Sequence, residues 1–238
     1  EDAQTCFNVN NLLAADPTAA VQTAGALPEK PVKARIVEQL LTDSGISAGD
    51  AEEIYQQLMD YLDGDTTTAK EGLETDAWAG VEPARLPANQ MMRTPGELKL
   101  LPAFPVAAYG KVSKVLCALP DTASKVDVNT LTEEQAPLLA ALFIGSLSED
   151  EAARLIASRP EEGWESMEAF QKELETNYPQ TKDALKQVQA FLAVNSHYFR
   201  VNSTGNTDDL TLRVVSQLHV DNEAGKVITW QRRYRMVE

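Results

Sequence analysis

An acidic stretch in the first third of the chain is the best candidate for chemistry. Residues 60–78 read DYLDGDTTTAKEGLETDAW and follow an amphipathic segment that predicts a helix. A helix C-terminus carries partial negative charge, so carboxylates gathered there repel it and one another unless a cation neutralises them. The carboxylates of this acidic loop are Asp60, Asp63, Asp65, Glu71, Glu74 and Asp76.

The ligand chemistry of the acidic loop favours a hard cation. Every candidate ligand atom is an oxygen, and no histidine or cysteine lies nearby in the sequence, which favours Ca²⁺ over zinc. The loop does not satisfy the EF-hand pattern, in which Asp-x-Asp-Gly spacing is followed by Glu at position twelve. A solvated acidic loop that binds nothing is the alternative interpretation of the same residues.

Cysteines and histidines offer little further chemistry. Cys6 and Cys117 form no C-x-x-C motif, so they are either two buried free thiols or one long-range disulfide. His197 and His219 fall on the polar face of predicted strands, without a nucleophile motif or a Gly-rich phosphate loop near them. We therefore expect no enzyme activity.

Predicted helices position the acidic loop. Apolar residues recur at helical spacing over 32–42, and Ser47 is a typical N-cap for a second helix that runs into the loop. Further along, Thr132 and Ser148 each begin a capping box, and together these two helix starts resemble a helix-hairpin-helix unit.

Parts of this pattern occur twice. F-N-V-N at 7–10 and V-D-V-N at 126–129 each end in an Asn before a helix start. T-P-G-E-L at 94–98 and W-E-S at 164–166 each introduce a later helix, at equivalent points of the two copies. The helical region is therefore predicted to be a divergent duplication over about 1–118 and 119–195.

The periodicity changes at Ser196. Residues 197–203, 210–220 and 228–236 alternate between apolar and polar types, with a hairpin turn at 222–225. This predicts an antiparallel meander of three strands with one apolar face. A helix must cover that face, either from the first part of the chain or from a segment upstream of Glu1.

Charge and composition restrict the function classes. The 238 residues carry a net charge of −15, and residues 1–195 hold 15 basic and 31 acidic side chains. Such a surface disfavours nucleic acid and suits a cation, a basic partner or simple solvation. A helix-hairpin-helix nucleic-acid-binding protein stays as one alternative, and an acidic extracytoplasmic hydrolase as another, although the latter would need an aromatic-lined cleft.

Four segments resemble the K-type minor pseudopilins of the bacterial type II secretion system. They are D-A-Q-T-C-F-N-V-N-N-L-L at 2–13, the acidic loop at 60–78, V-D-V-N-T-L at 126–131 and H-Y-F-R-V at 197–201, and they span almost the whole chain. The resemblance implies an α+β fold: a pseudopilin α/β core with an antiparallel sheet, and a large all-α insert with helix-hairpin-helix-like repeats. Residues 1–10 and 196–238 would form the core and 11–195 the insert, while the family's long N-terminal membrane helix would be mostly missing here.

The resemblance also implies a role and a site. A K-type pseudopilin caps the tip of the pseudopilus with the I-type and J-type minor pseudopilins, and it contacts secreted proteins. It would be the periplasmic domain of an inner-membrane-anchored protein. Calcium would bind Asp63, Asp65 and Glu74, with Asp76 as a fourth ligand because Gly72-Leu-Glu-Thr stands where the family has G-A-E-D. A periplasmic setting favours the disulfide between Cys6 and Cys117.

Overall fold

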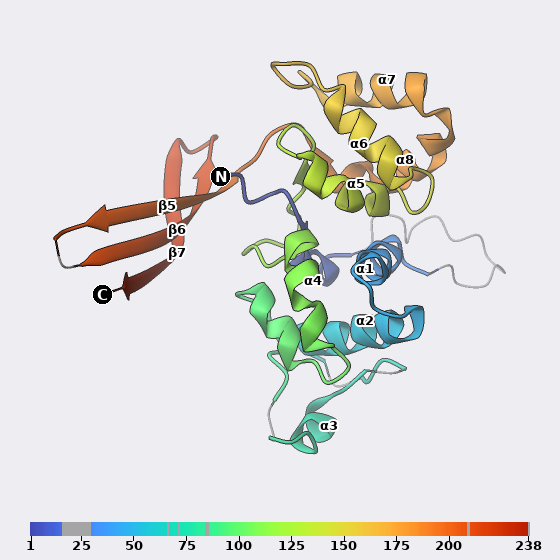
Figure 1. Ribbon diagram of the computed structural model, residues 1–238. Helices are drawn as coiled ribbons and strands as arrows, with labels where there is room; N and C mark the ends of the chain where they lie inside the picture. Colours follow the sequence, from blue (N-terminus) through green and yellow to red (C-terminus); the bar gives the residue numbers. More distant parts are fainter. Residues whose placement is uncertain (16–29, 66, 71, 84–85, 209, 238) are drawn as a thin grey trace.

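The chain forms a helical body with a small antiparallel sheet extending from one side (Figure 1). The computed structural model describes residues 1–15, 30–65, 67–70, 72–83, 86–208 and 210–237. The body contains α1 (Val32–Asp43), α2 (Ala48–Leu62), α3 (Thr75–Ala79), α4 (Tyr109–Val115), α5 (Ala136–Leu142), α6 (Glu149–Ala157), α7 (Met167–Asn177) and α8 (Lys182–Val188). Short 3-10 helices connect them: η1 (Val9–Leu13), η3 (Pro95–Leu100), η4 (Val106–Ala108), η5 (Glu133–Gln135), η6 (Pro179–Thr181) and η7 (Gln189–Phe191). The α+β class expected from the sequence is confirmed.

The predicted capping boxes are present. The backbone N–H of Ser148 donates to Glu151 Oε2 at 2.8 Å, and that of Thr132 donates to Gln135 Oε1 at 2.9 Å. Ser47 caps α2 by accepting the N–H of Asp50. These contacts satisfy donors that have no partner within the helix. Local sequence therefore fixes where the main helices begin.

Helix α1 lies at the centre of the body. It packs against α2 on one side and α5 on another, and α5 pairs with α6. Ile36, Leu40 and Leu41 of α1 are fully buried. One continuous apolar core joins the two halves of the body, and the rings of Phe7 and Phe191 meet there with centroids 5.9 Å apart.

Each half of the body closes with a short parallel strand pair. Strand β1 (Phe7–Asn8) pairs with β2 (Leu116–Cys117), and β3 (Val126–Asp127) pairs with β4 (Leu192–Ala193). The extended segment predicted at the N-terminus is thus short, because η1 begins at Val9 and the side chain of Asn8 caps it. Matching closures at both ends support the predicted duplication.

Two asparagines show the duplication at atomic detail. Asn10 donates to the carbonyls of Met92 and Leu119 and accepts the N–H of Met92 at 2.8 Å. Asn129 donates to the carbonyls of Trp164 and Val194 and accepts the N–H of Trp164 at 2.8 Å. In both halves, the side-chain amide of an Asn two residues after the first strand hydrogen bonds to two segments. One segment precedes a later helix, and the other follows the second strand of the parallel pair.

The sheet consists of β5 (Tyr198–Asn206), β6 (Thr211–Asp221) and β7 (Lys226–Val237), in that order. The predicted uniform apolar face of the last strand is wrong. A bulge opposite Gln217 and Leu218 leaves Trp230 without a cross-strand partner, so Tyr234 pairs with Val214 but Ile228 pairs with His219. Because one inserted residue reverses the alternation, Ile228 and Tyr234 face opposite sides of the sheet, and Ile228 lies on the polar face with His219.

The other face of the sheet is largely open. Leu212, Val227 and Tyr234 are 36%, 64% and 65% exposed, and among the described side chains of the three strands only Tyr198 is buried. The helical body therefore does not supply the cover expected for this face. No helix in the described parts of the chain has the length and apolarity to cross a membrane.

The first residues link the sheet to the body. Glu1 and Arg200 exchange hydrogen bonds, and Ala3 donates to Tyr198, so the N-terminal residues extend the edge of β5. Gln4 is buried, and its side chain accepts the N–H groups of His197 and Tyr198 while donating to Lys125. Within the proposed core segment 1–10, the first residues thus bond to the sheet, whereas Phe7–Asn8 pair inside the body.

Candidate metal centre

The end of α2 and the returning loop bring three predicted ligands together. Asp63 is the C-cap of α2, and its N–H donates to the carbonyl of Met59 at 2.9 Å. Asp65 follows one residue after Gly64, and Glu74 is the residue immediately before α3. One carboxylate oxygen from each of Asp63, Asp65 and Glu74 lies within 4.8 Å of the others.

Packing against α2 holds the returning loop in place. Trp78 is fully buried, its ring centroid lies 5.6 Å from that of Tyr61, and its Nε1 donates to the carbonyl of Leu73 at 2.8 Å. Leu73 directly precedes Glu74. The backbone N–H of Trp78 also donates to the carbonyl of Glu74 at 3.0 Å, so the tryptophan positions this metal-ligand candidate.

Asp60 shapes the loop from the inside. Its carboxylate accepts the N–H of Ala69 at 3.1 Å, and a Cβ added at Gly72 would lie 2.1 Å from Asp60 Oδ2. Only glycine allows the chain to pass so close to this side chain. The sequence placed Asp60 among the carboxylates of the loop, but in the structure it is a positioning residue.

The cluster is electrostatically unfavourable by itself. Burial raises the pKa of Asp63, and the charges of Asp65 and Asp60 raise it further. Burial likewise raises the pKa of Glu74, followed by the charges of Asp60 and Asp63. Asp63 Oδ1 and both carboxylate oxygens of Glu74 are buried without a hydrogen-bond partner among the described residues. Such groups cost stability unless something else satisfies them.

These residues fit a calcium ion. Ca²⁺ takes six to eight oxygen ligands at about 2.3 to 2.6 Å, so two oxygens on one ion lie up to about 5 Å apart. The three clustered carboxylates meet that limit, and water or backbone carbonyls would complete the shell. The cluster holds neither the nitrogen nor the sulfur ligands that zinc prefers.

The spacing of the three ligands carries a signal that the sequence interpretation missed. Asp63, Asp65 and Glu74 stand at the first, third and twelfth positions of an EF-hand loop. Thr67 and Thr68 occupy the fifth and sixth positions, where EF-hands have an acidic or amide residue and a glycine, so the motif is incomplete.

The remaining predicted ligands are not placed in this cluster. Asp76 lies in α3, but its side chain is outside the described part of the structure. Glu71 lies outside the described residues altogether.

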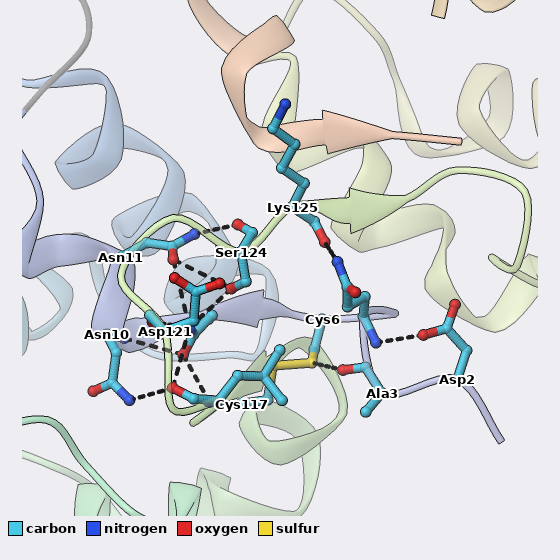
Figure 2. The surroundings of a disulfide bond; sticks show 12 residues. Asp2, Ala3, Cys6, Asn10, Asn11, Cys117, Asp121, Ser124 and Lys125 are labelled. Atoms are coloured by element: carbon cyan, nitrogen blue, oxygen red, sulfur yellow. Dashed lines mark hydrogen bonds between the residues drawn. A yellow bond between two sulfur atoms is a disulfide. The ribbon is translucent and has the colours of Figure 1, made fainter. Parts of the chain in front are cut away.

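A disulfide closes the first half of the body. Cys6 and Cys117 are bonded, with their Cα atoms 5.8 Å apart, which joins the residue before β1 to the last residue of β2 (Figure 2). Asn11 donates to the carbonyl of Ser124 at 2.7 Å beside it. The bond and these amide contacts hold together segments that are far apart in sequence.

The two histidines make their contacts within the sheet. The ring Nδ1 of His197 lies 3.3 Å from the carbonyl of Val220, and the ring of His219 stacks on Tyr198 at 4.7 Å. Within the described residues, no hydrogen bond joins either imidazole to a serine, threonine or cysteine side chain.

The fold and the site together define a class. A duplicated helical body that carries an acidic loop, beside a small antiparallel sheet, is the architecture expected of a pseudopilin with a helical insert. Two family models described as type II secretion system (T2SS), protein K match residues 5–121 and 126–192, which correspond closely to the two halves of the body. The chain belongs to the family of type II secretion system protein K.

Individual relatives agree with this assignment. The chain is 32% identical to type II secretion system protein K of Pectobacterium carotovorum subsp. carotovorum, over 98% of this chain and 68% of the relative. It is 34% identical to that of Klebsiella pneumoniae, over 83% of this chain and 57% of the relative, so it spans between half and two thirds of the latter's length.

A solved structure shows the same fold. A chain in the crystal structure of the GspK–GspI–GspJ complex from the enterotoxigenic Escherichia coli type 2 secretion system superposes with a TM-score of 0.80 at 24% identity. The match covers 99% of this chain and 78% of that chain. These comparisons lend no support to the nucleic-acid-binding or hydrolase interpretations.

Proposed function

We propose that the protein is a minor pseudopilin that caps the tip of the type II secretion pseudopilus and primes its assembly. The observation that carries this proposal is the match of both halves of the body to protein K. The shared fold with a chain from the GspK–GspI–GspJ complex supports the I-type and J-type minor pseudopilins as its partners. Its role is structural rather than enzymatic, and secreted proteins are further contacts of the tip.

The shape of the molecule suits an end position. The helical body is much larger than the sheet and projects beside it (Figure 1). In a filament built by stacking pseudopilin sheets and helices, such a body obstructs a subunit placed above it. The protein therefore fits the end of a filament better than its shaft.

The open face of the sheet suits a helix. Its apolar side chains include Leu212, Val227 and Tyr234, which are 36%, 64% and 65% exposed. A helix from residues upstream of Glu1 would cover this face and continue into the inner membrane, which would place the described domain in the periplasm. The disulfide agrees with such an oxidising compartment.

Calcium is the proposed ligand of the acidic loop. Asp63, Asp65 and Glu74 would hold it, and the ion would neutralise the repulsion that raises the pKa values of the buried carboxylates. Its role would be to fix the loop, because it would join the end of α2 to the residue before α3.

Reconstitution tests the proposed function. The purified protein is mixed with the periplasmic domains of the I-type and J-type minor pseudopilins from the same bacterium, and the masses are measured by light scattering after gel filtration. We expect a ternary complex with one copy of each. Failure to bind either partner, or antibody labelling along the whole pseudopilus rather than at one end, would overturn the proposal.

A further inference from the structure

A cleft between the sheet and the body gathers positive charge. Its volume is about 510 Å³, and it lies between the β5–β7 sheet and the region of η3 and α4. The charged residues that line it are Arg93, Lys99, Lys114, Arg200, Arg233 and Asp2. Five cations thus face one carboxylate in a chain whose net charge is −15.

These cations are available for a ligand. None of the five forms an ion pair with another described residue, although 36 acidic side chains are present in the chain. Like charges around a recess focus a positive potential and concentrate anions there. The charge of the cleft is therefore positive, whereas the net charge of the whole chain is negative.

The positive charge continues along the sheet. Arg233 pairs with Val215, and two residues further Arg213 and Arg235 lie directly opposite each other on the same face. Cross-strand pairs of like charge destabilise a sheet unless an anion lies between them. Strands β5 to β7 carry six basic residues and one acidic residue, Asp221, at the end of β6.

The lining also offers fixed polar contacts. Lys99 Nζ lies 4.2 Å from the centroid of the Tyr109 ring, which holds the ammonium at the wall. Gln217 and Gln231 hydrogen bond to each other at 3.3 Å on the floor. Both disulfide cysteines line the cleft as well, so a covalent bond keeps one wall in place.

We propose that this cleft binds an acidic peptide segment of another protein. Arginine presents a planar fork that matches a carboxylate, so Arg200 and Arg233 would take acidic side chains from the floor while Lys99 and Lys114 take others from the wall. A protruding peptide can enter a recess and reach both sides. A bilayer presents its phosphates in a plane, and the acidic surface of the body would repel it before the recess was reached.

A binding assay with matched charge variants tests the proposal. The probe is a short, capped, fluorescent peptide rich in Asp and Glu, and a Lys-rich peptide of the same length is the control probe. The variant Arg200→Gln with Arg233→Gln removes two charges from the cleft. The variant Lys172→Gln with Lys182→Gln removes two exposed charges from α7 and α8, away from it.

We expect the acidic peptide to bind at the cleft, and its affinity to fall with added salt. Any binding of the Lys-rich peptide to the acidic body should not weaken in the cleft variant. The cleft variant should weaken its Kd about fivefold, since each charged contact contributes roughly a factor of two to three, and the control variant less than twofold. Equal thermal melting of all variants shows that the fold is intact.

Three results would overturn the proposal. The first is that the acidic peptide fails to bind at low salt. The second is that the α7–α8 variant weakens binding as much as the cleft variant does. The third is that vesicles of anionic phospholipid bind as tightly as the peptide and lose affinity in the cleft variant, which would assign the site to a membrane.

Discussion

Removing calcium should destabilise the protein through the acidic loop. Without an ion, Asp63 Oδ1 and both oxygens of Glu74 are buried and unsatisfied among the described residues, and Asp60, Asp63, Asp65 and Glu74 repel one another. A ligand present at a hundred times its Kd stabilises the folded state by about 2.7 kcal/mol. For a chain of this size each kcal/mol shifts Tm by about 2 to 4 °C, so chelation should lower Tm by about 5 to 10 °C.

The assay is thermal melting under non-reducing conditions, with calcium or with a chelator. Glu74→Gln should lose most of the calcium-dependent shift, and in chelator it should melt no lower than the native protein, because one of the repelling charges is gone. Glu175→Gln, an exposed change on α7, is the matched control and should keep the full shift.

Two outcomes would contradict the reasoning. Identical melting of the native protein in calcium and chelator would mean that the loop binds no ion at this concentration. An equal shift with magnesium would contradict the selection of calcium, because magnesium demands near-ideal octahedral geometry that a loop with three clustered carboxylates does not impose.

Four further predictions concern stability. In chelator, Tm should rise as pH falls from 7 towards the ordinary carboxylate pKa values, and it should rise less in Asp63→Asn. The pKa values of Asp60, Asp63 and Glu74 are raised in the folded state, so their destabilisation is full above those raised values and is absent below the unfolded values. Replacing Cys6 and Cys117 with serine should lower the free energy of unfolding in urea by at most about 4 to 5 kcal/mol, because the bond closes a loop of 111 positions, and reductant should reproduce the loss in the native protein. Asn10→Ala, which leaves buried groups of Met92 and Leu119 unpaired, should cost about 2 to 4 kcal/mol in the same assay, and a larger cost for the half-buried Asn129→Ala would contradict this account. Gly72→Ala should cost about 1 to 3 kcal/mol through its clash with Asp60, whereas Gly64→Ala, with nothing within 4 Å, should change stability by less than about 0.5 kcal/mol.

Features encoded in neighbouring residues could be predicted from the sequence. The starts of α2 and α6 follow from Ser47 and Ser148, because a cap is decided within four residues. Local sequence indicates six carboxylates in the acidic loop, and the resemblance to K-type pseudopilins selects Asp63, Asp65 and Glu74 among them. The three-stranded meander follows from alternation and a tight turn.

Features that depend on distant pairing could not be predicted. The parallel pairs of β1 with β2 and of β3 with β4 are two residues long, which is too short for a periodic signal. The bulge at Trp230 changes a face through a single residue. The basic cleft draws its cations from several separate segments, and composition alone showed only an acidic chain.

The duplication explains where the proposed function lies within the body. Both halves use the same closing strands and the same asparagine, so these features serve packing and are common to both. The paired strands of the first half, β1 and β2, are separated by a longer stretch of chain than β3 and β4 of the second half. The acidic loop and the disulfide both lie in the first half. A pair of two-residue strands is a weak closure. The covalent bond beside β1 stabilises the longer half, and the calcium ion that we propose at the end of α2 would stabilise it further.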